Sequence, residues 1–455
     1  MGRRRNGRRV WKGAGAALLG LAMVFALPVP SKAGTEQPEQ PGQLDIGFGI
    51  NGHRTLDLGG TYDWAYATAL QRDGKILAAG VTNARGTYDF AVVRYLPSGE
   101  LDPSFGEDGV AITDFGKSRD WAYAMALQPD GAIVVAGESD SSGSRDFALA
   151  RYTAAGTLDS SFGKGGLVLT PVRPLTTDII HAVAIQPDGK IVAAGVTYDD
   201  TVSLRPNGDF MVARYLPNGD LDPAFGVGGV TTTNFDNESY DEPYAMVLQP
   251  DGRIVLGGSS NTGGGAGRIM GADNLALARY LPNGLLDPGF GDGGKVVVDA
   301  GAMQESIRAL ALQPDGAIVA AGRTNGEKRG DLLLARFMPN GQPDPSFGGS
   351  RAGMAIDDLG TAEEGLTSVA LAPDGMIIAG GVVAPRPNGD MLVVRYDRRG
   401  HLDRTFGHDG LATTDFGGRD DRLRALALQP DGKVVAVGSS ETDFALARFE
   451  GVAGR

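Results

Sequence analysis

The chain has 455 residues, of which 42% are hydrophobic, so it is long enough to bury a large core. Its formal net charge of −13 argues against binding to nucleic acid or to anionic membrane surfaces. The absence of cysteine excludes disulfide bonds and a thiol nucleophile.

The N-terminal segment, residues 1–33, has the plan of a secretory signal. A basic start that ends at Lys12 precedes an apolar run at 13–27, and Ser31-Lys32-Ala33 resembles a small-residue cleavage site. The string RRVWK, which ends at Lys12, also resembles a twin-arginine signal. A general secretory signal is the alternative.

Cleavage of this segment would leave a strongly acidic chain. It would remove seven Lys or Arg and no Asp or Glu, which changes the net charge from −13 to −20. No later stretch is apolar enough for a transmembrane span. We therefore expect a secreted or periplasmic bacterial protein, in which residues 34–43 form a short linker.

One sequence pattern recurs seven times along the chain. A PDG turn, written RDG in the first unit, separates two apolar runs, as in the string ALQPDGAIVVAG, and a glycine follows seven residues after its aspartate. The turn aspartates are Asp73, Asp130, Asp188, Asp251, Asp315, Asp374 and Asp431, at spacings of 57 to 64 residues. A second motif, Asp-x-x-Phe-Gly, has its aspartate at Asp45, Asp102, Asp159, Asp222, Asp287, Asp344 and Asp403. Such a period is typical of a propeller or a solenoid.

Each unit has the pattern of four short strands. In the second unit the runs are 122–128, 133–139, 146–152 and 167–172, rich in Val, Ile, Ala and aromatic residues and bounded by turn residues. Four strands repeated seven times predict an all-β fold, a seven-bladed β-propeller with four-stranded antiparallel blades over residues 44–450. A linear β-solenoid is the alternative, but its coils are usually shorter than about 57 residues.

The ends of the repeat predict how the ring closes. The first strand of each unit alternates small and large residues, as at Ala124 and Met125, so we place it next to the axis. An extra strand at 53–58 precedes the first unit, while the last unit stops after its third strand at 443–449. We expect these two strands to pair, which removes two exposed sheet edges. Residues 451–455 then form a short tail.

The repeated strings resemble a known repeat. ALQPDGK(I/V)VAAG, DFA(L/V)xRY and LDPSFGxDG are similar to the delta-sixty repeat of a bacterial β-propeller family of unknown function. The resemblance covers roughly residues 44–450. It implies a propeller in an exported protein and implies no particular activity.

Every third strand carries an arginine, and an aspartate or asparagine stands five residues earlier. The arginines are Arg94, Arg151, Arg214, Arg279, Arg336, Arg395 and Arg448. The earlier residues are Asp89, Asp146, Asp209, Asn274, Asp331, Asp390 and Asp443. A charge inside a strand needs a carboxylate or several carbonyl groups as partners. We interpret the pattern as an arginine–aspartate network that fixes blade geometry, with the Asp-x-x-Phe-Gly aspartate of the same unit as a further candidate partner. Seven binding sites are the alternative.

The entry to each first strand is the candidate site. An acid stands ten residues before each PDG aspartate, and a variable residue follows it three positions later. If the first strand lines the axis, these positions surround one mouth of the ring. The candidate ligand-binding residues are Asp63, Trp64, Tyr66, Asp120, Trp121, Tyr123, Asp178, His181, Asp241, Tyr244, Arg308 and Arg424. The alternatives are backbone hydrogen bonds for the acids and packing for the aromatic residues.

These side chains favour a binding or scaffold module for a glycan, a peptide or a protein partner at a surface. Two enzyme alternatives remain, a polysaccharide hydrolase or lyase that uses mouth carboxylates, and a quinone-dependent redox propeller. No histidine cluster has transition-metal spacing, and one carboxylate per blade is too widely spread for calcium, which takes about six to eight oxygens. We therefore expect a monomer with no metal and no cofactor.

Overall fold

The structure is a computed structural model that describes residues 40–172, 176–199, 208–236, 239–261, 272–325, 330–349, 353–361, 363–384 and 388–451. The chain divides into two units, Met1–Pro38 and Glu39–Arg455. The predicted signal segment, residues 34–39 of the linker and residues 452–455 of the tail lie outside the described residues. Within the described ranges there is no helix that could cross a membrane.

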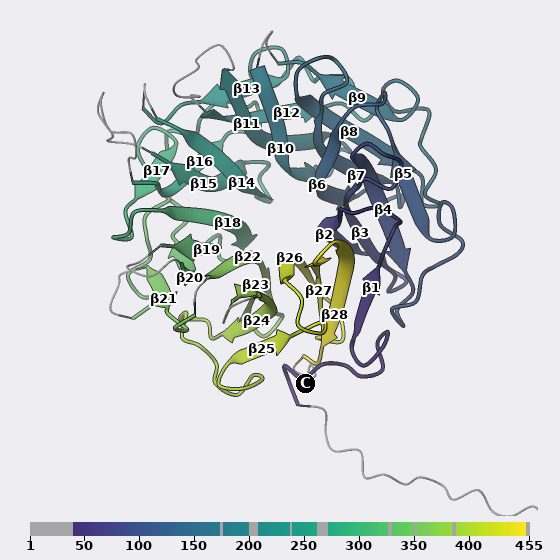
Figure 1. Cartoon of the computed structure of the whole chain (residues 1–455). Helices are drawn as coiled ribbons and strands as arrows, with labels where there is room; N and C mark the ends of the chain where they lie inside the picture. The colour runs from purple at the N-terminus through teal and green to yellow at the C-terminus, as the bar shows by residue number, and fades with distance from the viewer. Residues whose placement is uncertain are drawn as a thin grey trace, which may run out of the picture. The chain divides into compact units, whose positions relative to one another are not determined.

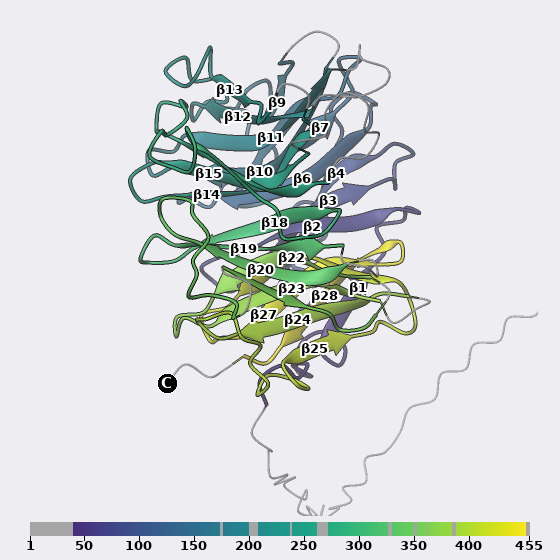
Figure 2. The same cartoon turned by 90° about the vertical axis from the view of Figure 1, so that its left-hand side faces the viewer.

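The second unit is a seven-bladed β-propeller, as predicted. Its 28 strands form seven four-stranded antiparallel sheets. Figure 1 shows these sheets as blades around a central axis, and Figure 2 shows the ring from the side. We number the blades in chain order, so blade 1 spans residues 63–113, and blade 7 combines residues 421–449 with the N-terminal strand at residues 53–56.

The four strands of a blade run from the axis outward. The innermost strands are β2 (Asp63–Leu70), β6 (Asp120–Leu127), β10 (Thr176–Ile185), β14 (Asp241–Leu248), β18 (Glu305–Leu312), β22 (Glu364–Leu371) and β26 (Asp421–Leu428). The second strands are β3 (Ile76–Thr82), β7 (Ile133–Ser139), β11 (Ile191–Asp199), β15 (Ile254–Ser260), β19 (Ile318–Thr324), β23 (Ile377–Val383) and β27 (Val434–Ser440). The third strands are β4 (Asp89–Tyr95), β8 (Asp146–Tyr152), β12 (Gly208–Tyr215), β16 (Asn274–Tyr280), β20 (Asp331–Phe337), β24 (Asp390–Tyr396) and β28 (Asp443–Phe449). The outer strands are β5 (Val110–Thr113), β9 (Leu167–Thr170), β13 (Val230–Thr233), β17 (Lys295–Val298), β21 (Met354–Asp357), β25 (Leu411–Thr414) and β1 (His53–Leu56).

The hydrophobic core lies between neighbouring blades. The second and third strands are buried on both faces, as the continuous runs of buried residues in β3 and β4 show. Leu77 and Val92 of blade 1, for example, share one apolar cluster with Ile133 and Ala148 of blade 2. Such a cluster fills each of the seven blade junctions. Burial of these strands from both sides explains why they are apolar throughout and do not alternate.

A β-bulge in every innermost strand explains the recurring glycine. In β2, Ala65 pairs with Gly80 and Ala67 with Ala79, so Tyr66 is an extra residue between them. The same register shift occurs in the other six blades. A Cβ on Gly80 would lie only 1.9 Å from the carbonyl oxygen of Trp64. The bulge therefore requires glycine opposite it, and it sets the direction of the fourth side chain of the strand.

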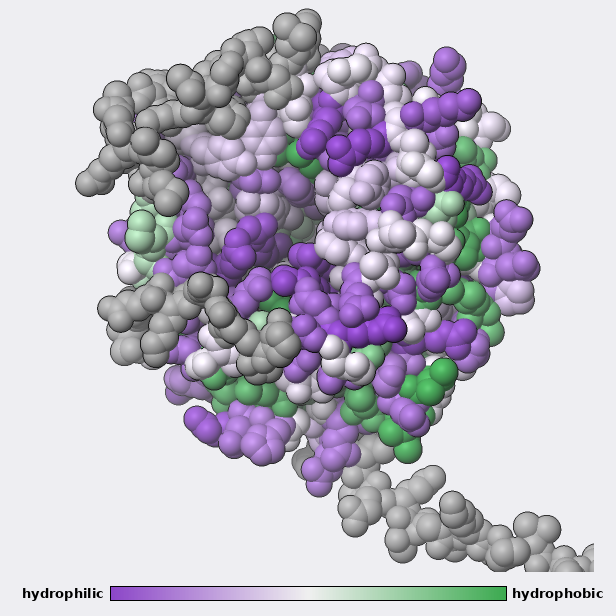
Figure 3. Space-filling view, viewed as in Figure 1, coloured by the Kyte–Doolittle hydropathy of each residue, from purple (hydrophilic) through white to green (hydrophobic). Residues whose placement is uncertain are grey.

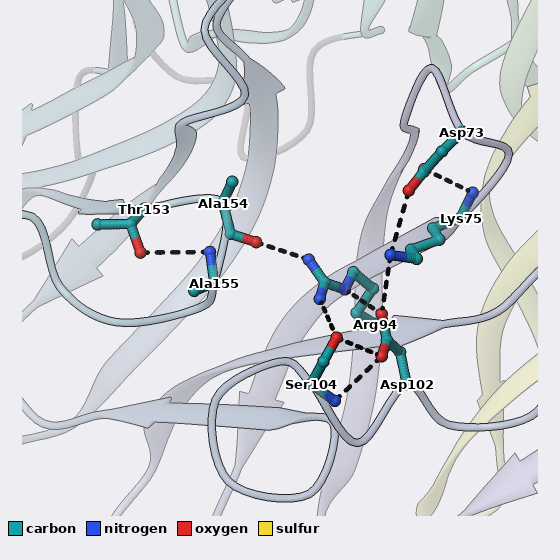
Figure 4. A network of polar contacts seen from close by, with 8 residues as sticks. All are labelled: Asp73, Lys75, Arg94, Asp102, Ser104, Thr153, Ala154 and Ala155. Atoms are coloured by element: carbon teal, nitrogen blue, oxygen red, sulfur yellow. Dashed lines mark hydrogen bonds and ion pairs between the residues drawn. The ribbon is translucent and has the colours of Figure 1, made fainter.

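The third-strand arginines contact both the Asp-x-x-Phe-Gly motif of their own blade and the next blade, as Arg94 shows. Arg94 Nε donates to Asp102 Oδ2 at 2.8 Å, and Nη1 donates to the carbonyl oxygen of Ala154 in blade 2 at 2.6 Å (Figure 4). Its guanidinium also lies over the ring of Phe105, 4.6 Å from the centroid. The corresponding pairs are Arg151–Asp159, Arg214–Asp222, Arg279–Asp287, Arg336–Asp344, Arg395–Asp403 and Arg448–Asp45. The predicted network therefore forms through the Asp-x-x-Phe-Gly aspartates, and it links neighbouring blades.

The ring closes through the N-terminal segment, as predicted. Strand β1 pairs with β28, so the last sheet has the order β1-β28-β27-β26. The backbone N–H of Asp45 donates to the carbonyl oxygen of Arg448 at 2.8 Å, and the Arg448 side chain binds the Asp45 carboxylate. Residues 42–56 therefore complete blade 7 with the motif and the outer strand that its own chain end lacks.

Some predicted strand limits need correction. Strand β6 begins at Asp120 and not at 122, because Asp120 still pairs with Ser139. Strand β9 ends at Thr170 and not at 172, and β1 ends at Leu56 and not at 58. In both of these strands the last paired residue lies opposite the phenylalanine of the third strand, Phe147 or Phe444, and the chain then turns toward the next blade.

Candidate functional site

The bulged residues of the innermost strands form a ring around the axis. This channel ring consists of Tyr66, Tyr123, His181, Tyr244, Arg308, Thr367 and Arg424. All seven side chains are half-buried. Six of them were predicted as site residues, and the structure brings these six together in one arc.

The members of the arc touch one another in sequence. The ring centroids of Tyr66 and Tyr123 are 5.3 Å apart, those of Tyr123 and His181 are 5.5 Å apart, and those of His181 and Tyr244 are 5.4 Å apart. The guanidinium of Arg308 lies 3.7 Å from the Tyr244 centroid. The guanidinium of Arg424 lies 5.6 Å from the Tyr66 centroid, at the other end of the arc. A continuous surface of aromatic rings thus has a cation at each end.

A second group of aromatic side chains lies at the entry to blades 1 and 2. This aromatic cluster consists of Tyr62, Trp64, Tyr88 and Trp121, and Tyr62 stacks on Trp64 with centroids 4.0 Å apart. Tyr62 and Tyr88 both approach Trp121, at 5.3 and 5.2 Å. Trp64 Nε1 donates to the carbonyl oxygen of Glu441 at 2.8 Å, which fixes its ring between blades 1 and 7. Figure 3 shows mainly hydrophilic residues around the centre of the face that it views.

The four acids predicted for the mouth do not line it. Asp63, Asp120, Asp178 and Asp241 are fully buried. Each accepts a backbone N–H from the segment that follows the preceding outer strand, and the donors are Leu58, Phe115, Val172 and Phe235. Successive side chains of a strand point to opposite faces. The acids therefore point into the blade, while the residues one and three positions after each acid face the axis. The structure therefore supports the alternative reading of these acids as acceptors for backbone amides.

Asp178 makes folding stability depend on pH. Burial raises its pKa to about 6, although Val172 N–H and Thr176 Oγ1 donate to it. An acid with a raised pKa in the folded state contributes stability below its unfolded value of 3.8, and this contribution is lost as the pH rises through about 6. We expect Asp178→Asn to reduce the fall in melting temperature between pH 4 and pH 7, measured by calorimetry at constant ionic strength. An unchanged slope in this variant would contradict the assignment.

The polar centre of the channel wall is Glu242. His181 Nε2 lies 3.1 Å from its Oε1, while Tyr240 and Tyr244 donate their hydroxyl groups to its Oε2 at 3.0 and 2.8 Å. Tyr198 Oη lies 2.9 Å from Tyr240 Oη and extends this network. Burial alone would raise the pKa of Glu242, but His181 and the two tyrosines lower it to about 2. Glu242 is therefore an ionised carboxylate that holds His181 in place.

A second carboxylate that interacts electrostatically with His181 is Glu138, and its pKa moves in the opposite direction to that of Glu242. Glu138 belongs to β7, and only 5% of the residue is exposed. Its Oε2 is 3.7 Å from Arg145 Nη1, and Tyr123 Oη is 3.5 Å from its Oε1. Burial raises its pKa, although the charges of Arg145 and His181 oppose this. Two carboxylates near one histidine thus have pKa values moved in opposite directions.

Three arginines at the channel form no ion pair with another described residue. They are Arg308, Arg424 and Arg323 of β19. Burial lowers the pKa of Arg424 and of Arg323, and the charge of Arg308 lowers both further. Arg424 Nε is buried without a hydrogen-bond partner. The channel therefore holds three guanidinium groups that have no carboxylate within ion-pair distance among the described residues.

Sequence reasoning missed several of these residues. Glu242 occupies the position that Trp64 and Trp121 hold in blades 1 and 2, so the two-residue alternation from Tyr244 would have identified it. Glu138 and Arg323 lie on second strands, opposite Trp121 and Ser306, and no regular pattern marks them.

Six segments of the chain match the model of the family described as "Domain of unknown function (DUF5122) beta-propeller", at residues 71–105, 128–162, 186–225, 249–290, 313–347 and 429–451. In these six segments the chain is similar to DUF5122 repeats. The first five DUF5122 segments run from the end of an innermost strand to the phenylalanine of the Asp-x-x-Phe-Gly motif. They contain the recurring glycine and arginine and none of the seven channel-ring residues, so the DUF5122 match describes the scaffold and not the site.

The chain is also similar to solved structures. A catalytically inactive virginiamycin B lyase from Staphylococcus aureus with quinupristin is 9% identical, with 88% of this chain and 99% of that chain covered and a TM-score of 0.47. Sqt1 from Chaetomium thermophilum is 15% identical, with 87% and 98% covered and a TM-score of 0.46. The polysaccharide lyase Uly1 is 11% identical, with 87% and 94% covered and a TM-score of 0.47. No curated protein matches the sequence.

Proposed function

We propose that this chain is an exported binding module whose channel takes an acidic glycan. The observation that carries the proposal is the set of arginines without ion-pair partners, because Arg308 and Arg424 lie at the two ends of the aromatic arc. A guanidinium that is half-buried without a carboxylate is best stabilised by an anionic ligand, and its planar fork suits a sugar carboxylate. Export rests on the predicted signal segment, residues 1–33.

The aromatic cluster supports a sugar as the rest of the ligand. Trp64 and Trp121 are half-buried, and they lie beside the channel ring, with Tyr66 6.5 Å from Trp64 and 6.4 Å from Trp121. Aromatic faces next to a few fixed polar groups are typical of small-ligand sites, in which apolar contact supplies affinity and polar groups supply specificity. Uronic acid residues combine an apolar ring face with a carboxylate. We therefore favour an acidic oligosaccharide over a peptide.

The test compares an acidic and a neutral oligosaccharide of equal length. Oligogalacturonate and cello-oligosaccharide would be titrated into the chain by calorimetry, together with the variants Arg308→Gln and Arg424→Gln. Loss of one charged hydrogen-bond donor costs about 1.5–3 kcal/mol, so we expect each variant to bind oligogalacturonate about 10- to 100-fold more weakly. Arg404→Gln is the control, since Arg404 is exposed and its partner Asp409 lies 3.9 Å away. Equal binding of the neutral oligosaccharide, or full affinity in both channel variants, would contradict the proposal.

A second candidate function is cleavage of the same kind of glycan. The observation that favours it is the pair Glu138 and Glu242 near His181, with a raised and a lowered pKa, because an acid and a base of a hydrolase or lyase need such a difference. Chromatography of the titrated mixture distinguishes the two candidates. Shortened oligosaccharides that disappear in His181→Ala would favour the enzyme, and intact ones would favour the binding module.

A further inference from the structure

Acidic side chains gather in threes where two blades meet. At the junction of blades 1 and 2, Asp89, Asp114 and Asp120 each offer a carboxylate oxygen, and these oxygens lie within 4.8 Å of one another. Asp89 is the first residue of β4, Asp114 follows β5, and Asp120 begins β6. The same arrangement occurs at Asp390, Asp415 and Asp421, between blades 6 and 7. Sequence reasoning considered one acid per blade and missed the two that the preceding blade adds.

The junction of blades 1 and 2 also contains a buried oxygen without a partner. Asp89 is fully buried, and its Oδ1 accepts a hydrogen bond from Thr87 Oγ1 at 3.2 Å. Its Oδ2 is buried and has no hydrogen-bond partner. An unsatisfied carboxylate oxygen beside two further carboxylates is costly in a folded protein unless a cation binds there.

At other blade junctions, a side chain of the protein donates a hydrogen bond to the residue that corresponds to Asp89. At the junction of blades 7 and 1, Arg419 Nη1 lies 3.4 Å from Asp443, the residue that corresponds to Asp89. Between blades 3 and 4, Asn234 replaces the middle acid, and its amide donates to Asp209 at 2.8 Å. Between blades 2 and 3, Ser142 and Ser144 donate to Asp146. In contrast, the only side-chain donor to Asp89 among the described residues is Thr87, and the second carboxylate oxygen of Asp89 has no hydrogen-bond donor.

We propose that Asp89, Asp114 and Asp120 bind a calcium ion that joins blade 1 to blade 2. The three carboxylates are hard oxygen ligands, and no imidazole belongs to the cluster, which favours calcium over zinc. Calcium also accepts irregular coordination completed by water, which exposed Asp114 allows, whereas magnesium demands a near-ideal octahedron. The proposal is independent of the glycan.

The three aspartates lie next to the aromatic cluster, so an ion bound by them would affect that cluster. Asp120 directly precedes Trp121, and Tyr88 directly precedes Asp89. The rings of Tyr88 and Trp121, 5.2 Å apart, are two of the four members of the aromatic cluster. An ion that holds Asp89 and Asp120 together would therefore also fix the distance between these two rings.

Calcium binding to the full chain would be measured by equilibrium dialysis and by thermal unfolding after EDTA treatment. Sites of this kind bind with a dissociation constant of about 0.1–1 mM. We expect 10 mM CaCl₂ to raise the melting temperature by about 2 °C or more, and 10 mM MgCl₂ to raise it less. Asp114→Asn should bind one calcium fewer per chain than the wild type.

Asp114→Asn also separates loss of the ion from loss of the fold. Asp114 is exposed, and asparagine retains the oxygen that accepts the N–H of Gly116. In EDTA this variant should be at least as stable as the wild type, because one of three mutually repelling charges is gone. Asp108→Asn, an exposed acid of the same blade, is the control and should bind calcium as the wild type does. Equal calcium uptake by Asp114→Asn and the wild type, or an equal thermal shift with magnesium, would overturn the proposal.

Discussion

A chain that begins at residue 59 will unfold at a much lower temperature than a chain that begins at residue 40, and it will aggregate. The deletion removes β1, which leaves β28 as an exposed edge. It also removes Asp45, whose carboxylate binds Arg448 and Lys433, and Phe48, which is fully buried between blades 7 and 1. Loss of a strand ladder with these contacts costs at least about 5 kcal/mol, at roughly 1 kcal/mol for each hydrogen bond. Calorimetry and light scattering of the two chains measure the effect.

A point variant separates the effect of the exposed sheet edge from the effect of the lost ion pairs. Asp45→Asn keeps β1 and its backbone hydrogen bonds but leaves Arg448 and Lys433 without the Asp45 charge. We expect this variant to lose stability and to stay monomeric, because the edge remains covered. If the chain that begins at residue 59 is monomeric and as stable as the longer one, the closure does not support the ring.

Replacement of Arg279 by alanine will destabilise the ring by about 3 kcal/mol or more. Arg279 Nε binds Asp287 Oδ2 at 2.8 Å, its guanidinium lies over Phe290, and it donates to the carbonyl oxygen of Pro339 in blade 5. Its side chain is 9% exposed. Breaking a buried pair costs about 3–5 kcal/mol, because the remaining partners lose a charge that they cannot replace. Urea unfolding at pH 7 measures the difference.

The same carboxylate provides a matched control. Arg253 Nε also binds Asp287 Oδ2 at 2.8 Å, but its side chain is 36% exposed. Arg253→Ala should therefore destabilise the ring much less than Arg279→Ala, because exposed ion pairs contribute little. Arg279→Lys should recover only part of the loss, since an ammonium group cannot bind both the carboxylate and the Pro339 carbonyl in one plane. Equal losses in Arg253→Ala and Arg279→Ala would show that burial between blades contributes nothing.

The positions predicted to surround the mouth were located in part, and whether they bind a ligand stays a prediction. The residue three positions after the entry acid lies in the channel ring in every blade, because the bulge opposite the recurring glycine recurs with the scaffold. The acids themselves, such as Asp63 and Asp120, were placed on the wrong face, because the distance from the PDG turn does not show which way a side chain points. Glu242 and Glu138 were missed, since each occurs at its position in one blade only and no repeat marks it.

The all-β class, the seven blades and the closure could be predicted from the amino-acid sequence alone. The first two follow from a pattern that occurs seven times, and the closure follows from the unpaired strands at the two ends of that pattern. Such a pattern can be recognised without information on contacts between distant residues, because each strand, turn and bulge is specified within about 60 residues. Which charged side chains meet, in contrast, depends on the folded ring and could not be predicted from the repeat. Arg308 and Arg424 stand at the ends of one arc, and Asp89 and Asp120 share one junction, although each pair comes from different blades. Ring curvature brings them together, and the spacing of residues along one chain does not encode the distance between neighbouring blades.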